Sequence, residues 1–303
     1  MGIDKFYRRG AFPALSVNGV EVFGFYPTAG KTYFVWKGGN NTNGLNWKNA
    51  FTTIAGAIAA HTAFRATQTY KSVDTYIIIA PDTYEENIIA LPFSCHMIGL
   101  GHIGTDKATE ISPAEGIAMA GTCSGLHLYN IRFEGEGSGD ICDFSILNCS
   151  IIENCQFVPK SAAMAAAISF EDCKETIIRN NRFTTGGALY CDYGIKFIHG
   201  GVDKYCHNTI IEDNIINGAV KATGTGIHIA ADCTASGAVI RRNVIHLAGA
   251  GIGIDDDSDG ALVYDNKVFH VGGTPYDINA ALSMNNRAND NGTVTEVPDL
   301  AQY

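Results

Sequence analysis

The segment ETIIRNNRF at residues 175–183 recurs with variation along the chain, as NTIIEDNII at 208–216 and GAVIRRNVI at 237–245. Six such segments align at intervals of 23 to 33 residues. Their first column contains Leu128, Ile152, Ile178, Ile211, Ile240 and Val263, and the column five residues later contains Phe133, Phe157, Phe183, Ile216, Ile245 and Val268. Because both columns are wholly apolar, we expect them to point into one continuous core.

A third column lies between these two and is occupied by asparagine in four consecutive segments: Asn181, Asn214, Asn243 and Asn266. An asparagine can turn the chain by adopting the left-handed conformation. Its side-chain amide can also bond to the asparagine one coil above or below. The column therefore predicts an asparagine ladder.

A weaker apolar phrase lies downstream in successive repeats. It reads AISF at 167, GIKF at 194, GIHI at 226 and GIGI at 251. Each repeat thus contains at least two short strands whose side chains alternate. Such alternation within a repeat of this length indicates a parallel β-solenoid, whose coils stack about 4.8 Å apart.

On these residues the chain resembles the right-handed parallel β-helix, or pectin-lyase-like, family, and the predicted fold class is all-β. We expect an N-terminal arm at 1–30, a strand and an amphipathic capping helix at 31–74, the β-helix at 75–285 and a polar tail at 286–303. Trp47, Phe51, Ile54 and Ile58 are expected on one face of the capping helix. The tail is interpreted as an exposed arm or as a strand that reaches a neighbouring molecule.

The succession of strand, helix, APDTYEENI at 80–88 and IGLGH at 98–102 resembles the opening of β-helix proteins of tailed bacteriophages. That resemblance implies a virion protein assembled in the bacterial host cytoplasm, in contact with other virion proteins such as the capsid protein. The first hypothesis is that the chain is a non-enzymatic, head-associated capsid decoration protein. The alternatives are a tailspike-type protein that attaches to a host surface glycan, and a polysaccharide lyase or glycoside hydrolase.

Composition narrows the class of partner. The chain has 303 residues, a net charge of −10 and 17% charged residues, which argues against nucleic acid or an anionic membrane as a partner. The start lacks the apolar core of a signal peptide, and no apolar run of about 18 residues predicts a membrane span. Nine scattered cysteines without a CxxC motif are expected to be reduced, mostly buried thiols.

Outward-facing columns beside the core column indicate how the surface is used. An aliphatic stripe precedes the core column and comprises Ile151, Ile177, Ile210, Val239 and Leu262. An exposed apolar surface of this extent is typical of an interface, so we predict a homo-oligomer, most plausibly a trimer, or docking onto another protein. A covering arm of the same chain is the alternative. The next column alternates acidic and basic residues, such as Glu153 with Arg179 and Glu212 with Arg241, and these are expected to pair along the helix axis.

Catalytic and metal-binding signals are weak. Outward positions of the second phrase are expected to be Ser169, Lys196, His228, Gly253 and Ser283, a set with no acid pair, so no catalytic residue is assigned. Asp255, Asp257 and Asp259 imitate the start of a calcium loop, although Asn266 stands where that loop needs glutamate, and calcium is the only cofactor suggested. His228 and His246 are single histidines on separate coils, and they are interpreted as surface or turn residues and not as ligands. Tyr190, Tyr193 and Tyr205 are candidate glycan contacts that could equally close over the core.

Overall fold

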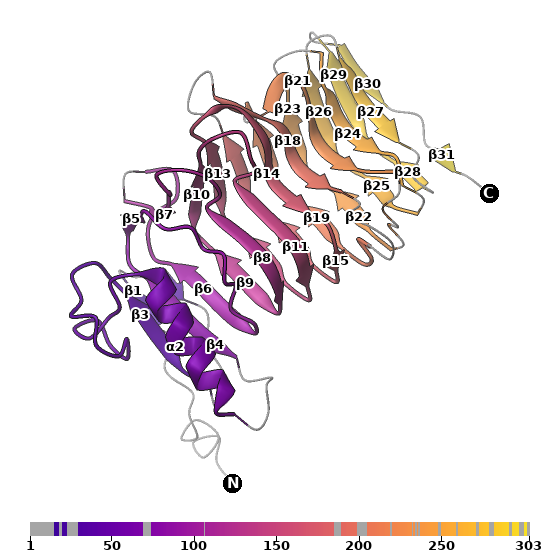
Figure 1. Cartoon of the computed structure of the whole chain (residues 1–303). Helices are drawn as coiled ribbons and strands as arrows, with labels where there is room; N and C mark the ends of the chain where they lie inside the picture. The colour runs from indigo at the N-terminus through magenta and orange to yellow at the C-terminus, as the bar shows by residue number, and fades with distance from the viewer. Residues whose placement is uncertain are drawn as a thin grey trace.

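The computed structural model describes residues 30–68 and 74–290, apart from 106, 185–188, 199–204, 219, 232, 234, 236, 248–249, 259, 271–272 and 279–281. It also describes the short segments 15–17, 20–22, 293–296 and 300–301. Within these residues the chain forms a right-handed parallel β-helix whose coils stack along a single axis (Figure 1). The predicted fold class is therefore confirmed.

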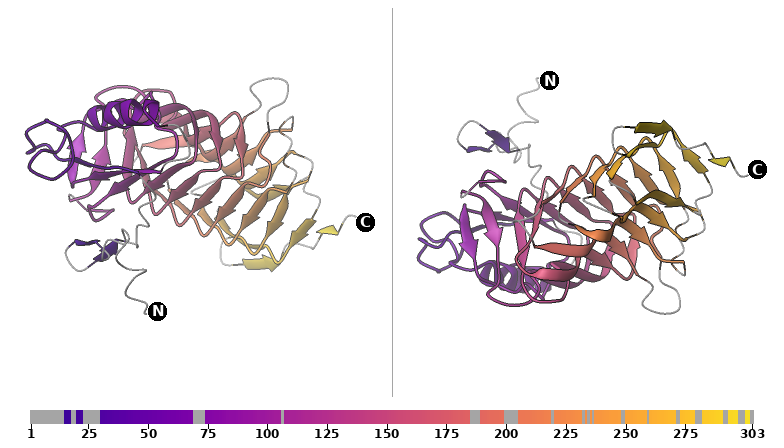
Figure 2. Two further views of the ribbon diagram at one scale, coloured as in Figure 1. Left: turned by 90° about the horizontal axis from the view of Figure 1, so that it is seen from below. Right: turned by 90° about the horizontal axis from the view of Figure 1, so that it is seen from above.

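Three parallel sheets form the walls of the helix, and two further views show their strands stacked coil upon coil (Figure 2). Sheet 1 comprises β3 (Thr32–Val35), β4 (Thr75–Ile79), β6 (Cys95–Gly99), β9 (Leu126–Tyr129), β12 (Ile151–Glu153), β16 (Ile177–Arg179), β19 (Ile210–Glu212), β22 (Val239–Arg241), β25 (Leu262–Tyr264), β28 (Leu282–Met284) and β31 (Leu300–Ala301). Sheet 2 comprises β5 (Asp82–Tyr84), β7 (Thr109–Ile111), β10 (Arg132–Gly135), β13 (Gln156–Pro159), β17 (Arg182–Thr184), β20 (Ile215–Asn217), β23 (Val244–His246), β26 (Lys267–His270), β29 (Arg287–Asp290) and β30 (Thr293–Glu296). Sheet 3 comprises β8 (Met119–Ser124), β11 (Cys142–Asn148), β14 (Ala162–Phe170), β15 (Cys173–Lys174), β18 (Tyr190–Phe197), β21 (Val220–Ile229), β24 (Ile252–Asp256) and β27 (Thr274–Ile278).

The core is built from the two apolar columns of the repeat. Leu128, Ile152 and Ile178 pair in register in sheet 1, as the sequence predicts. In sheet 2, Phe157 lies between two other phenylalanines whose ring centroids are 5.3 and 5.0 Å away. A second aromatic stack lines sheet 3 and consists of Phe144, Phe170 and Phe197. Parallel stacking of identical side chains therefore fills the interior.

The asparagine ladder is present at the turn between sheets 1 and 2. The Nδ2 of Asn181 donates to Oδ1 of Asn214 at 3.0 Å, and the same bond continues to Asn243, Asn266 and, as a further member, Asn286. All these asparagines are buried. The expectation that they themselves adopt the left-handed conformation is wrong, because the residue before each one does so. These left-handed residues include Asn180, Asp213, Arg242, Asp265 and Asn285.

A helix covers the N-terminal end of the solenoid. α2 (Ile54–Ala66) buries Ile54 and Ile58 against the core, as predicted. Its first backbone N–H groups, at Ile54 and Ala55, donate to the carboxylate of Glu86 at 2.8 and 2.9 Å. A carboxylate stabilises this end because the helix dipole is positive there. Trp47 and Phe51, which were expected on the helix, precede it in a loop.

The ends of the solenoid differ from the expected boundaries. β3 already pairs in parallel with β4, so sheet 1 begins at Thr32. At the other end β29 pairs in parallel with β26, and β30 then folds back antiparallel on β29. β31 lies antiparallel to β28. The described segments of the tail therefore close sheets of their own chain. In the N-terminal arm, β1 (Leu15–Val17) and β2 (Val20–Val22) form an antiparallel hairpin.

All nine cysteines lie in the described part of the chain and none forms a disulfide; eight are buried and Cys149 is exposed. This arrangement agrees with the prediction of reduced, mostly buried thiols. Burial raises the pKa of Cys155 to about 12, which keeps its thiol protonated and unreactive at neutral pH. No helix among the described residues is long and apolar enough to cross a membrane.

Candidate functional site

The outward face of sheet 3 carries a continuous line of polar side chains. Parallel pairing places six of them in register on successive coils, and we call this set the polar row: Asp143, Ser169, Lys196, His228, Asp255 and Asp277. At about 4.8 Å per coil, the row extends over roughly 24 Å. It is therefore long enough to contact several units of an extended polymer.

This composition corrects the sequence-based assignment of the same face. Ser169, Lys196 and His228 occupy the expected positions, but Asp255 follows them in place of Gly253, and Asp277 follows Asp255. Ser283 lies in sheet 1, where it is buried. The expected absence of acids from this face is thus wrong, and the missed members are Asp143, Asp255 and Asp277.

A recurring break in strand alternation explains the error. In GIHI at 226, Gly226 and Ile227 both face inward: a Cβ on Gly226 would lie 2.7 Å from the core side chain of Ile245, and Ile227 is buried. The partner of Ile227 is Ile254, so the equivalent phrase begins at Gly253, two residues later than predicted. The same break in GIKF places Tyr193 and Lys196 on one outward face, where Lys196 Nζ lies 4.5 Å from the Tyr193 ring centroid.

Two carboxylates converge at the N-terminal end of the polar row. The Ser169 hydroxyl oxygen lies 2.6 Å from Asp140 Oδ2 and 3.0 Å from Asp143 Oδ1. A hydroxyl has only one proton to donate, so two hydrogen bonds require that one of the carboxyls also carries a proton. Burial raises the pKa of Asp140; the Ser169 hydrogen bond and the charge of Lys196 oppose the shift, whereas the charge of Asp143 adds to it. Asp140 is thus the better candidate to hold the proton.

A second cluster lies two coils further along the row. His228 Nδ1 is 2.9 Å from Asp255 Oδ2, and both side chains are only 15% exposed. The Tyr193 ring lies beside the imidazole, with its centroid 5.3 Å away. Burial raises the pKa of Asp255, and the charges of Asp257 and Asp277 raise it further, whereas His228 opposes the shift. His228 therefore lies on the outer face of sheet 3, where a surface position was expected, and pairs there with Asp255.

The calcium prediction falls on the same cluster. Asp255, Asp257 and His228 each place one ligand atom within 4.8 Å of the others. Asp259 lies outside the described residues. The structure thus joins two of the predicted aspartates to a histidine from the preceding coil, which sequence spacing alone does not indicate. His246 lies elsewhere, exposed at the end of β23 and near Asn217.

The remaining predicted contacts are distributed over other parts of the surface. Tyr190 begins β18 and pairs in register with Ala162, so it shares a strand with Tyr193. Tyr205 lies apart from both and packs against Lys174 and His207. The three tyrosines therefore do not form one cluster, and only Tyr193 belongs to the polar row's surface.

The aliphatic stripe exists as a structural feature. Ile151, Ile177, Ile210, Val239 and Leu262 pair in register along the outer face of sheet 1, and each is partly exposed. The neighbouring charged column pairs as predicted: Arg179 contacts Glu153 at 3.0 Å, and Arg241 contacts Glu212 at 2.7 Å. These ion pairs join adjacent coils.

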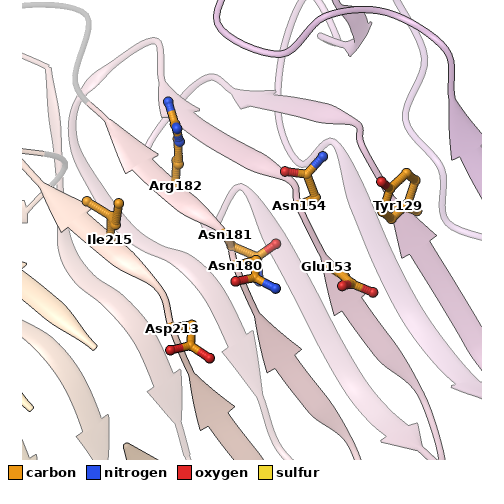
Figure 3. A pocket seen from close by; sticks show the side chains of 8 residues that line it. All are labelled: Tyr129, Glu153, Asn154, Asn180, Asn181, Arg182, Asp213 and Ile215. Carbon is orange, nitrogen blue, oxygen red and sulfur yellow. The ribbon is translucent and has the colours of Figure 1, made fainter. Parts of the chain in front are cut away.

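A polar hollow of about 430 Å³ lies at the corner between sheets 1 and 2 (Figure 3). Its lining residues are Tyr129, Glu153, Asn154, Asn180, Asn181, Arg182, Asp213 and Ile215. Figure 3 shows these side chains arising from consecutive turns. Glu153 and Asp213 are already paired with Arg179 and Arg242, and Asn181 belongs to the ladder. The hollow is therefore a less favourable reactive site than the polar row.

Fold and surface together define a right-handed parallel β-helix with an ionisable row on one sheet. Residues 85–290 match the family model described as "Periplasmic copper-binding protein (NosD)". This match covers more than half of the chain, so the chain belongs to the NosD family. No curated protein matches the sequence.

Solved structures share the fold at low sequence identity. The alginate lyase from Paenibacillus sp. str. FPU-7 is 12% identical, with a TM-score of 0.50 over 76% of this chain and 93% of the lyase. Pectate lyase Pel9A is 13% identical, with a TM-score of 0.49 over 86% and 78% of the two chains. PfbA, a surface adhesin of Streptococcus pneumoniae, is 11% identical, with a TM-score of 0.41 over 78% and 86%. The likeness to the alginate lyase extends to the fold alone.

Proposed function

We propose that this protein binds a polysaccharide along the polar row and cleaves it at Asp140 and Asp143. The observation that carries the proposal is the contact of both carboxyl groups with the single hydroxyl of Ser169. Glycoside-cleaving enzymes use two carboxyl groups in which one is protonated and the other ionised. The raised pKa of Asp140 fits the protonated member of such a pair.

The short separation of the carboxyls selects between two reaction courses. Inverting enzymes keep their carboxyls about 6.5–9.5 Å apart to admit a water, and retaining enzymes keep them about 5–5.5 Å apart. Two groups that contact one hydroxyl oxygen fit the retaining class. Asp140 then protonates the leaving glycosidic oxygen while Asp143 attacks the anomeric carbon. Water, deprotonated by Asp140, afterwards releases the sugar from the Asp143 ester.

The rest of the row fits a binding role. Lys196 and Tyr193 offer a cation and an aromatic face one coil beyond Ser169. An alginate lyase and a pectate lyase are among the solved structures of similar fold. Their sequence identity to this chain is so low that the similarity is limited to the fold. The proposal therefore rests on the side chains of the row.

The test is release of new reducing ends from a panel of neutral and uronic-acid polysaccharides. Asp140→Asn and Asp143→Asn are each expected to lower turnover by about 10²-fold or more while the bound polysaccharide is retained. Asp213→Asn, an exposed aspartate at another corner, is the matched control and should leave turnover unchanged. Proton NMR of the fresh product should show retention of the anomeric configuration.

Four outcomes would overturn parts or all of the proposal. Equal turnover of wild type and both variants would remove the two aspartates from the reaction. An unsaturated product would assign elimination in place of hydrolysis. Polysaccharide binding without cleavage anywhere in the panel would leave the protein a lectin-like binder, and absence of binding would reject the glycan proposal altogether.

A second candidate function is a non-enzymatic structural component, and the aliphatic stripe on sheet 1 favours it. Five stacked aliphatic side chains, partly exposed on a sheet face, suit self-association or docking onto a protein partner. On this proposal the chain is a capsid decoration protein or tailspike of a tailed bacteriophage, assembled in the host cytoplasm and trimeric in the virion. The resemblance of residues 80–102 to phage β-helix proteins supports it.

Light scattering coupled to size-exclusion chromatography tests the stripe. We expect a trimeric mass for the wild type and a monomeric mass for the double variant Ile177→Asp with Ile210→Asp. Ile215→Asp alters an exposed isoleucine on sheet 2 and should leave the mass unchanged. A wild-type monomer would contradict self-association, and binding of isolated capsid shells by the wild type alone would favour the decoration role.

The family description names copper, and the donor set near the polar row is compatible with that metal. His228, Asp255 and Asp257 offer one imidazole nitrogen and two carboxylate oxygens. Nitrogen and oxygen donors suit Cu²⁺, whereas Cu⁺ prefers sulfur. These three residues would therefore hold a cupric ion, which supplies Lewis acidity when bound.

A further inference from the structure

The cluster of His228, Asp255 and Asp257 differs from the rest of the polar row because its ligand atoms converge. From this convergence we infer that the three residues form a specific site for a divalent transition-metal ion, Zn²⁺ or Cu²⁺, on the outer face of sheet 3. One ligand atom of each residue lies within 4.8 Å of the other two. Donor atoms bound to one ion at about 2.0–2.2 Å lie at most about 4.4 Å apart, so small side-chain movements bring these three atoms into coordination distance.

The backbone holds the ligands in place without a metal. His228 on β21 and Asp255 on β24 are direct register partners in the parallel ladder. Asp257 follows β24 immediately, and its backbone N–H donates to the carbonyl oxygen of Ile229 at 3.0 Å. The Tyr193 ring beside the imidazole limits the rotation of His228. A site assembled by rigid coils loses little conformational entropy on binding.

The charges of the cluster also favour a cation. Asp255, Asp257 and Asp277 bring three carboxyls to one region, where His228 contacts Asp255. Among the described residues the exposed side chain of Asp257 has no hydrogen-bond or ion-pair partner, so its carboxylate can bind an ion without losing another contact. Lys196, one coil before His228, lies over the Tyr193 ring.

The donor types select the class of metal. Calcium takes six to eight oxygen ligands, and a site with an imidazole nitrogen and two carboxylates is too small for it. Zinc and cupric ions accept imidazole together with carboxylate oxygen. Three protein ligands leave one position open for water or a ligand group. The site therefore differs from the predicted calcium loop both in its ligands and in its metal.

This inference stands apart from the proposed cleavage reaction. The metal ligands lie on β21 and on the coil that follows it, whereas Ser169 lies two coils before His228, and Asp140 and Asp143 lie three coils before it. Metal titration needs no polysaccharide, and polysaccharide cleavage can be measured in a chelator. Asp140→Asn should retain metal binding, so failure of one proposal is distinguishable from failure of the other.

Isothermal titration of the chelator-stripped full chain with ZnCl₂, CuCl₂ and CaCl₂ tests the site. The wild type should bind one Zn²⁺ or Cu²⁺ per chain. His228→Ala and Asp257→Asn should each weaken binding by about tenfold or more. Paramagnetic resonance of the Cu²⁺ complex should show nitrogen coupling in the wild type and lose it in His228→Ala.

Matched variants exclude nonspecific binding and misfolding. His246→Ala removes an exposed histidine from sheet 2 and should leave both affinity and nitrogen coupling unchanged. His228→Gln keeps a polar side chain on the sheet, so its circular dichroism and melting curve should match the wild type while the metal is lost. Unchanged Zn²⁺ and Cu²⁺ affinity in both His228 variants would overturn the inference, as would binding of Ca²⁺ alone.

Discussion

The side-chain nitrogen Nδ2 of Asn214 donates a hydrogen bond to Oδ1 of Asn243 on the next coil, with a donor–acceptor distance of 3.0 Å. The same nitrogen donates to the backbone carbonyl of Ile178 on the preceding coil at 2.9 Å. Oδ1 of Asn214 accepts from both the backbone and side-chain nitrogens of Asn181. One buried amide therefore joins three coils, which explains why the ladder recurs at this turn.

Replacing Asn214 by alanine should destabilise the protein strongly. The change leaves the Ile178 carbonyl and the Asn181 amide buried without their partners, and each orphaned group costs about 1–3 kcal/mol. We expect a loss of roughly 3–5 kcal/mol in the free energy of unfolding, measured by urea denaturation. Asn217→Ala, which removes an exposed asparagine from the following strand, should cost less than about 0.5 kcal/mol. Similar losses for the two variants would contradict the ladder's role.

Replacing Cys149 by glycine should stabilise the protein. Cys149 is exposed and has a φ of 48°, in the left-handed region that costs a residue with a Cβ about 1–2 kcal/mol. Glycine removes that strain but raises the entropy of the unfolded chain, so we expect a net gain of about 0.5–1 kcal/mol. Cys149→Val should instead lose stability, because a β-branched side chain tolerates this conformation poorly. A lower thermal midpoint for the glycine variant would refute the prediction.

Acid should destabilise the fold between pH 6.5 and about 4 through His127 and His61. Burial lowers the pKa of each histidine from 6.5 to about 4, with His96 contributing at His127 and Arg65 at His61. Between these two pH values the two histidines are protonated in the unfolded chain but remain neutral in the folded chain. The free energy of unfolding therefore decreases as pH falls. Each histidine contributes a slope of up to about 1.4 kcal/mol per pH unit.

Urea midpoints at pH 7.5, 6 and 5 measure this slope. His127→Gln should reduce the slope of unfolding free energy against pH by about the contribution of one histidine, because glutamine does not titrate. His246→Gln alters an exposed histidine and should leave the slope unchanged. A wild-type stability independent of pH across this window would show that these histidines are not excluded from protonation.

Truncating Phe157 should open a cavity inside the solenoid. Its side chain is 1% exposed and lies between Phe133 and Phe183 in a continuous stack. Phe157→Ala is expected to cost about 3–5 kcal/mol, and the smaller truncation Phe157→Leu less than half of that. Phe93→Ala, on a 45% exposed phenylalanine, should be nearly neutral in the same thermal assay. Equal effects at Phe157 and Phe93 would argue against the stacked core.

The fold was predictable because its defining features are local and repeated. Ile152, Ile178 and Ile211 occupy equivalent positions in short segments, and an apolar residue at the same place in every coil can only be explained by stacking. The left-handed position was harder to assign, because both Asn180 and Asn181 are asparagines that could turn the chain. Packing decides between them: Asn181 is buried in the ladder, and Asn180 takes the positive φ.

The candidate site was missed for a physical reason of the same kind. GIGI at 251–254 contains two consecutive Gly–Ile pairs that look alike in sequence. Only the second pair fits opposite Gly226 and Ile227, where Gly253 lies against Val268 and the Pro275 carbonyl with no room for a Cβ. A shift of two residues replaces Gly253 by Asp255 on the outer face. Asp140 precedes β11 and does not belong to any of the repeated segments, so the repeat pattern gives no indication of its position.

Sequence by itself determined the coil repeat, the apolar columns, the asparagine ladder and the aliphatic stripe. Each of these features depends only on which residue type recurs at the same position of successive repeats. Only the tertiary structure decided that Asp140 meets Asp143 at Ser169, and that His228 meets Asp255 and Asp257. Ser169 lies one coil beyond the two aspartates that it contacts, and His228 lies one coil before Asp255 and Asp257, with loops of unequal length between these coils. Their meeting depends on the register between coils, which is set by packing around glycines and not by distance along the chain.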